Sequence, residues 1–238
     1  MCGFLFMKGK EKMKIGILGT GIVGKTLAVK LNELGNEVMI GTRNVSETMA
    51  KMDKDMMGGS PFKEWHSNNP KIKLGTFVDS AQSGDIIILA THGVITTRVI
   101  DSAGKNNFKG KVVIDTTNPL DFSQGMPPKF AATLGNSLGE QIQKHIPEAK
   151  VVKAFNTVNA YVMISPKREE GDPDFFVAGN DEDAKKKVKS LAEQMGWQRI
   201  IDLGDISHSY WLEALTMFWV NYGFKNNNWS HAFKLLIK

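Results

Sequence analysis

Residues 14–24 read Lys-Ile-Gly-Ile-Leu-Gly-Thr-Gly-Ile-Val-Gly, and this stretch decides the fold. Its first part, Lys14–Leu18, is a short apolar run typical of a buried strand, and three glycines follow it at GxGxxG spacing. Gly21–Leu34 then carries apolar residues at helical spacing and is stopped by Gly35-Asn36. Because a second strand is expected at Glu37–Ile40, the sequence predicts a βαβ unit whose first strand and helix are joined by the glycine loop.

The three glycines of this loop suit a bound phosphate for distinct physical reasons. Gly19 would make the tight turn, Gly21 would admit a pyrophosphate close to the backbone, and Gly24 would let the helix pack against the strand. Free amides and the helix dipole attract anions at such a helix start. The spacing also occurs by chance as a simple turn, so the strand and helix around it carry the argument. We expect a dinucleotide to contact Gly19, Thr20, Gly21, Ile22, Val23 and Gly24.

The end of the second strand indicates which dinucleotide is bound. An acidic residue about 20 positions after the loop would accept hydrogen bonds from the adenine ribose hydroxyls, but this chain has Gly41-Thr42-Arg43-Asn44 there. The guanidinium of Arg43 and the hydroxyl of Thr42 can hold a ribose phosphate through charge-assisted hydrogen bonds. The sequence therefore favours NADP(H) over NAD(H), although an arginine at a strand end can also be simply solvated.

Short apolar runs alternate with helical stretches along the rest of the chain. Ser207 is expected to cap a final helix with aromatic residues at helical spacing, and another helix is expected over Asp183–Met195. The pattern predicts an α/β fold, a doubly wound, mostly parallel Rossmann sheet with a small C-terminal helical appendage. The further strands are expected at Ile72–Phe77, Asp85–Ala90, Lys111–Asp115, Val151–Phe155, Phe175–Ala178 and Gln198–Leu203.

The domain boundaries follow from the same pattern. Residues 1–12 precede the first convincing strand and are interpreted as a flexible N-terminal extension, residues 13–206 as the NADP-binding Rossmann domain. Residues 207–238 form the C-terminal helical segment, which packs on that domain or on a dimer partner. The Gly125–Pro128 stretch is expected to be a loop.

Composition argues against several classes of protein. The 238 residues carry a formal net charge of +5, but the lysines are scattered, which favours a basic solvated surface over a nucleic-acid site. These lysines include Lys71, Lys111, Lys144, Lys153 and Lys185–Lys189. Cys2 is the only cysteine, which fits a reducing compartment, the cytoplasm, and no run is long enough to predict a membrane span. No metal site is expected, because no short ligand spacing connects His66, His92, His145, His208 and His231.

Polar residues follow three later strands, where ligands of open α/β sheets collect. The segments are Thr91-His92-Gly93, Thr116–Pro119 and Asn156–Ala160. His92 is interpreted as a pocket wall or hydrogen-bond donor more readily than as a general base, because no carboxylate partner is evident. Asn118 precedes a proline and either shapes a turn or contacts the cofactor. No catalytic side chain is therefore assigned.

The chain resembles the coenzyme F-420-dependent NADP oxidoreductase family, which also includes the cytosolic oxidoreductase domain of the STEAP metalloreductases. The resemblance rests on Ile17–Gly24, Gly41–Asn44 and Val151–Thr157, and it runs from about Met13 to the end. The deazaflavin reductases of this family carry His rather than Asn within the segment matched by Ala154–Thr157. They also carry a Pro-Trp pair near the position of Gly93-Val94, so this chain departs from them at two places.

The resemblance implies contacts for both halves of NADP. Thr20–Val23 would contact the pyrophosphate, and Thr42 and Arg43 the 2′-phosphate. The nicotinamide half would be contacted by Thr91, His92, Asn118 and Ala160.

The leading hypothesis for function is hydride transfer between NADPH and a flavin- or deazaflavin-type acceptor. Such chemistry depends on positioning more than on an ionisable side chain. The alternatives are an NADPH-dependent reductase of a small carbonyl or imine compound, and a non-catalytic NADPH-binding sensor. A small-molecule hydride acceptor and a homodimer are expected, the latter mainly from the resemblance.

Overall fold

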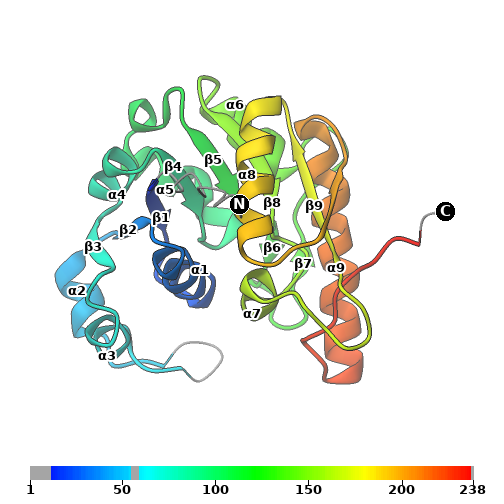
Figure 1. Ribbon diagram of the computed structural model, residues 1–238, viewed down its shortest axis with the longest axis horizontal. Helices are drawn as coiled ribbons and strands as arrows, with labels where there is room; N and C mark the ends of the chain where they lie inside the picture. Colours follow the sequence, from blue (N-terminus) through cyan, green and yellow to red (C-terminus); the bar gives the residue numbers. More distant parts are fainter. Residues whose placement is uncertain (1–11, 55–58, 237–238) are drawn as a thin grey trace, which may run out of the picture.

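The computed structural model describes residues 12–54 and 59–236, and one eight-stranded sheet runs through them. Its strands are β1 (Lys14–Leu18), β2 (Glu37–Thr42), β3 (Lys73–Thr76), β4 (Ile86–Leu89), β5 (Val112–Asp115), β8 (Lys150–Ala154), β9 (Asp174–Gly179) and β10 (Arg199–Asp202). The spatial order is β10-β9-β8-β5-β4-β1-β2-β3 (Figure 1). All neighbouring pairs are parallel except β8 and β9, which are antiparallel. The predicted doubly wound, mostly parallel sheet is confirmed.

Helices cover both faces of this sheet (Figure 1). One face is covered by α1 (Ile22–Glu33), α7 (Ala160–Ile164) and α8 (Glu182–Gln194). The other face is covered by α4 (Phe77–Ser83), α5 (Thr96–Ala103), α6 (Leu138–His145) and α9 (Ser209–Asn226). Three elements lie beside the sheet or its loops: α2 (Val45–Ala50), α3 (Phe62–Ser67) and a hairpin of β6 (Leu120–Asp121) with β7 (Lys129–Phe130). Short 3-10 turns occur at Gly93–Ile95, Lys105–Phe108 and Ile206–His208.

Alternating side chains of the central strands fill two separate cores. In β4, Ile86 and Ile88 lie in the core under α1, whereas Ile87 and Leu89 lie in the core under α5. This period of two is the geometry of a strand, and burial on both faces explains why these strands read as continuous apolar runs. Burying one such side chain contributes about 1.5–3 kcal/mol.

The strand order predicts a ligand site at the carboxyl ends of the central strands. Because β2 and β3 lie on one side of β1 and β4 lies on the other, the order reverses between β1 and β4, which pair with Leu18 opposite Leu89. Ligands of open α/β sheets bind at such a switch point, beyond the carboxyl ends of the strands. The glycine loop follows β1, so it lies at this switch point.

Two expectations about the second half of the chain need correction. Ser207 does not cap the final helix; it lies inside the Ile206–His208 turn, and α9 begins at Ser209. The cap of that turn is Asp205, because its carboxylate accepts hydrogen bonds from the Ser207 backbone at 2.9 Å and hydroxyl at 2.6 Å. Lys153 and Lys185 are buried, at 0% and 3% exposure, so they do not belong to a solvated basic surface.

The expectation of a flexible extension lies almost entirely outside the described residues, which begin at residue 12. Within residues 12–54 and 59–236, no helix is long and apolar enough to cross a membrane.

Candidate functional site

The glycine loop has the geometry that a phosphate cradle requires. Gly19 has a φ of 131°, and a Cβ on it would come within 2.3 Å of the Ala90 carbonyl oxygen. A Cβ on Gly24 would come within 2.2 Å of the Gly19 carbonyl oxygen, so this glycine allows α1 to pack closely on the loop. At Gly21, by contrast, a Cβ would meet no described atom within 4 Å. Packing thus requires glycine at the first and third positions, and open space is left in front of the second.

A cleft of about 650 Å³ opens in front of this loop. The loop is also the start of α1, where Gly21 is the N-cap and no side chain caps the helix. The unpaired amides of the first turn and the helix dipole therefore favour an anion in the cleft. The predicted residues that line the cleft are Gly19, Thr20, Gly21, Ile22, Val23, Thr42, Arg43, Thr91 and His92. Gly24, Asn118 and Ala160 do not line it.

One end of the cleft is basic. Arg43 is exposed, and its guanidinium pairs with none of the described residues. Lys51 and Lys54 line the same end with Asp53, so that three positive side chains accompany one negative side chain there. This charge balance suits a phosphate monoester. The sequence alone does not predict a role for the two lysines, because no pattern in this short exposed segment indicates that it faces the cleft.

Thr42 has a structural partner beside this basic end. Its hydroxyl lies 2.6 Å from the hydroxyl of Thr48, and both side chains are buried. Asn44 caps α2 by accepting a hydrogen bond from the Glu47 backbone at 3.1 Å. The Thr42–Asn44 segment therefore fixes the start of α2 at the same time as it presents Arg43 to the cleft.

The opposite end of the cleft lies beyond β4. The Thr91 hydroxyl lies 3.0 Å from the hydroxyl of Thr96, which also donates to the His92 carbonyl at 3.2 Å. The exposed His92 ring packs edge-on against Phe122, with ring centroids 6.1 Å apart. Apolar side chains of Ile95 and its neighbours complete this end of the cleft. It can hold a flat ring, and His92 is its ionisable side chain among the lining residues beyond β4.

Asn118 belongs to a hydrogen-bond network beside the cleft. Its amide group donates to the Asn156 carbonyl at 2.9 Å and accepts from the Asn156 side chain at 2.9 Å. The Thr216 hydroxyl, from α9, lies 3.0 Å from the same Asn118 oxygen. Ala160 is buried at the start of α7. The side chain of Asn118 is therefore occupied in joining the loops after β5 and β8 to α9.

The residue before Asn156 adopts a backbone conformation that bulky side chains rarely take. Phe155 has a φ of 65°, and its ring is buried at 4.6 Å from the ring of Phe175. A left-handed phenylalanine costs about 1–3 kcal/mol and persists where the surroundings enforce it. The turn lets the chain leave β8 with Phe155 in the core and Asn156 facing Asn118.

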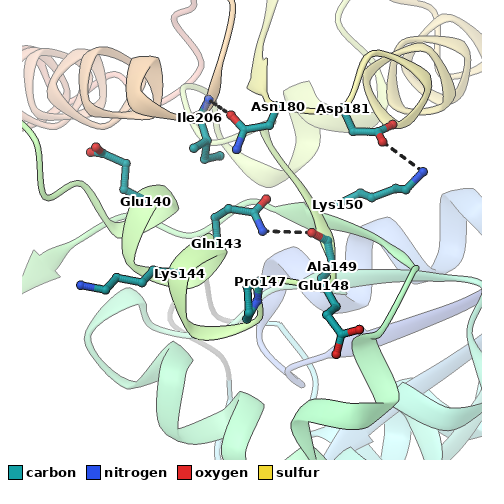
Figure 2. A pocket seen from close by; sticks show the side chains of 10 residues that line it. All are labelled: Glu140, Gln143, Lys144, Pro147, Glu148, Ala149, Lys150, Asn180, Asp181 and Ile206. Atoms are coloured by element: carbon teal, nitrogen blue, oxygen red, sulfur yellow. Dashed lines mark hydrogen bonds and ion pairs between the residues drawn. The ribbon is translucent and has the colours of Figure 1, made fainter.

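A second hollow, of about 540 Å³, lies between α6 and the start of α8 (Figure 2). Several of its polar side chains already have partners in the protein. Gln143 donates to the Ala149 carbonyl at 2.9 Å, Asn180 accepts from the Ile206 backbone at 3.0 Å, and Lys150 lies 3.0 Å from Asp181. We therefore place the candidate site in the cleft beside the glycine loop.

Comparisons with known proteins show the family of the chain. The family described as "NADP oxidoreductase coenzyme F420-dependent" matches residues 14–119, which span the glycine loop and Asn118. The F420-dependent NADP reductase of Methanocaldococcus jannaschii is 35% identical over 86% of this chain and 89% of its own length. The metalloreductase STEAP3 of Rattus norvegicus is 26% identical over 87% of this chain but 37% of its own length.

A solved structure from Arthrobacter sp. FB24, provisionally named an F420-dependent NADP reductase, is 41% identical to this chain. It superposes with a TM-score of 0.88 over 94% of this chain and 100% of its own. A reductive aminase from Aspergillus terreus has a TM-score of 0.60 at 12% identity, so it is similar in fold alone. The chain therefore belongs to the coenzyme F420-dependent NADP oxidoreductase family, and it is an NADP(H)-dependent oxidoreductase.

Proposed function

We propose that this oxidoreductase transfers hydride between NADPH and a flat aromatic acceptor of the flavin or deazaflavin class. The observation that carries this proposal is the composition of the cleft beyond β4, where His92 packs on Phe122 and apolar and hydroxyl side chains form the wall. A ring-to-ring hydride transfer needs two stacked rings held in contact, and such a wall supplies positioning. The names of relatives as F420-dependent NADP reductases support the same acceptor class.

The cofactor fits the cleft in a defined direction. Its pyrophosphate would lie against Gly21 and the uncapped start of α1, where an added Cβ finds open space. Its 2′-phosphate would lie at the basic end, against Arg43 with Lys51 and Lys54 nearby. The nicotinamide half would then reach Thr91 and the neighbouring histidine. When bound, NADPH supplies the hydride, and the residues of this chain bind it, orient it and exclude water.

The experiment is a titration followed by a panel of acceptors. NADPH and NADH are titrated separately, and the NADPH complex is then mixed with a deazaflavin, FMN, FAD, ferric iron and a small ketone while absorbance at 340 nm is followed. We expect NADPH oxidation with one of the ring acceptors. Oxidation with the ketone alone would replace the proposal by a carbonyl reductase, and tight binding without turnover would favour a sensor.

We also propose that two copies of the chain form a homodimer through α9. Trp211, Phe218 and Tyr222 lie along this helix at helical spacing and are 55%, 63% and 41% exposed. Such a row of exposed aromatic residues is typical of an interface. Sedimentation is expected to give a dimer at micromolar concentration, and Phe218→Glu is expected to give a monomer that still binds NADPH. A monomeric parent protein would contradict the proposal.

A further inference from the structure

A fully buried lysine lies outside the cleft and is not explained by cofactor binding. Lys153 is the last residue but one of β8 and is 0% exposed. Its ammonium nitrogen lies 2.7 Å from Asp115 Oδ2, 2.8 Å from Glu213 Oε1 and 2.8 Å from the Thr117 carbonyl oxygen. The three N–H donors of the ammonium group therefore each have an acceptor. We call Asp115, Lys153 and Glu213 the buried triad.

The buried triad is an expensive way to stabilise a core. Taking charges out of water costs several kcal/mol for each ion, and apolar residues of similar volume often stabilise as well or better. Burial lowers the pKa of Lys153, but the two carboxylates outweigh it, and the pKa lies above its usual value. The lysine is therefore charged at neutral pH. What the triad provides beyond stability is a fixed set of hydrogen bonds between distant elements.

The hydrogen bonds of the triad hold two backbone segments. Asp115 Oδ1 accepts from the Thr117 backbone at 2.9 Å and from the Thr117 hydroxyl at 2.6 Å. On the other side of the lysine, Glu213 accepts from the Leu138 and Gly139 backbones at 3.0 and 2.9 Å. The triad thus joins the loop after β5 to the start of α6, with β8 and α9 supplying the remaining charges.

The loop after β5 is in turn fastened to the wall of the cleft. The Thr116 hydroxyl donates to the Leu89 carbonyl, the last of β4, at 2.8 Å. The Asn118 carbonyl lies so close to Gly93 that a Cβ on this glycine would come within 2.0 Å of it. Between these two anchors the chain runs through Thr91 and the following histidine, which line the cleft. A shift of the loop after β5 would therefore shift that wall.

We propose that Lys153 is a positioning residue, which holds the Thr116–Asn118 loop and, through it, the wall of the cleft where hydride is transferred. The effect on the rate of hydride transfer rests on the proposed function. The effect on the position of the loop rests on the geometry of the triad alone. Because misplacement of a reacting group by about 1 Å can cost roughly 100-fold in rate, the triad acts on the rate of transfer more than on cofactor affinity.

The first test measures amide hydrogen exchange in the protein without cofactor. Thr117→Val removes the hydroxyl bonded to Asp115 and keeps the shape of the side chain, and Lys153→Met removes the ammonium group. Both variants are expected to exchange faster at residues 116–118 while β1 keeps its protection. Lys185→Met is the matched control, because Lys185 is also buried between two carboxylates, on α8 and away from the cleft. If Lys153→Met does not fold, Thr117→Val decides whether Asp115, the carboxylate that Lys153 holds, fixes the loop.

The second test separates rate from affinity. In single-turnover oxidation of bound NADPH, Thr117→Val is expected to be roughly 10-fold slower, with the affinity for 2′,5′-ADP unchanged. Equal losses in rate and affinity, or wild-type exchange at residues 116–118 in Thr117→Val, would overturn the positioning role. If none of the acceptors lets the wild-type protein oxidise NADPH, the proposed function fails by itself. The exchange data still decide whether the triad holds the loop.

Discussion

The two ends of the cofactor cleft are built in different ways. The end beside Arg43 comes from one continuous stretch of chain, so that its glycine loop and Arg43 lie within residues 19–43 and its two lysines follow by residue 54. The end beyond β4 depends on loops and helices from across the chain: Asn118 bonds to Asn156, 38 residues away, and to Thr216, 98 residues away. The first end is therefore encoded locally and its parts are recognisable in the sequence. The second exists only once the sheet and α9 have assembled.

The largest expected effect comes from the glycine at the strand end. Gly19→Ala places a Cβ on a residue with φ of 131° and within 2.3 Å of the Ala90 oxygen, so we expect a loss of about 3 kcal/mol of unfolding free energy or more. Gly21→Ala is the matched control, because its Cβ meets open space. This variant is expected to keep the unfolding free energy of the parent and to lose NADPH affinity. Equal losses of stability in both variants would contradict the view that packing requires glycine at position 19 but not at position 21. Urea unfolding and NADPH titration measure the two effects.

Arg43 tests whether the locally encoded end selects the dinucleotide. Arg43→Ala is expected to weaken NADPH binding by about 1.5–3 kcal/mol, roughly 10- to 150-fold, because one charge-assisted hydrogen-bonding group is lost. NADH binding is expected to remain nearly unchanged. Arg98→Ala, which removes an exposed arginine of α5 outside the cleft, is the control for net charge. An equal loss of affinity for NADPH and NADH would contradict the assignment of Arg43 to the 2′-phosphate.

The other end of the cleft is tested through its network. Asn156→Ala removes the donor to Asn118 Oδ1 at 2.9 Å and to the Leu212 carbonyl at 3.0 Å, leaving buried acceptors short of partners. We expect a loss of about 1–3 kcal/mol in unfolding free energy. Affinity for 2′,5′-ADP should be unaffected, because the adenosine end does not depend on these contacts. A parallel loss of that affinity would mean that the two ends are not independent.

The same difference explains how much was predictable from the sequence. The succession of strands along the chain, the doubly wound sheet and the lining role of Gly19–Val23 and Arg43 follow from periodicity and one motif. Asn118 was expected at the cofactor by its place after a strand, but its partners Asn156 and Thr216 are set by tertiary packing. The contact of Asn118 with NADP stays a prediction.

Lys153 shows most clearly what could not be predicted from the sequence. Lysines are almost never fully buried unless they are paired, so a lysine next to an apolar run is more readily interpreted as part of the surface. Its partner Asp115 is 38 residues away in the sequence and ends a different strand. The signal that could have marked it is its position inside β8, between Val152 and Ala154, where both faces of the sheet are buried. A charged residue there needs a partner from another element.

The smallest effect is expected far from both ends of the cleft, at the outer sheet edge. Asp174 of β9 is buried and bonds to Arg199 at 2.5 Å and to the Leu235 backbone at 2.6 Å. Burial alone would raise the pKa of Asp174, but these hydrogen bonds outweigh it, and the pKa lies below its usual value. A lowered folded-state pKa gives stability that is present above the unfolded value, about 3.9, and is lost as pH falls through the folded value. We therefore expect the stabilisation from this group to be constant between pH 6 and 8.

The measurement is urea unfolding of the parent protein and of Asp174→Asn from pH 7 to pH 3. At pH 7 the variant is expected to be less stable by about 1 kcal/mol, since one charged hydrogen-bonding pair is weakened. The difference should shrink as the pH falls below about 4, because the unfolded parent binds a proton there, whereas the folded parent binds it only at lower pH. NADPH affinity at pH 7 should be the same in both proteins, since neither Asp174 nor Arg199 lines the cleft. A gap that stays constant down to pH 3 would show that the charge of Asp174 contributes nothing, and a change in NADPH affinity would show that the sheet edge and the cleft are coupled.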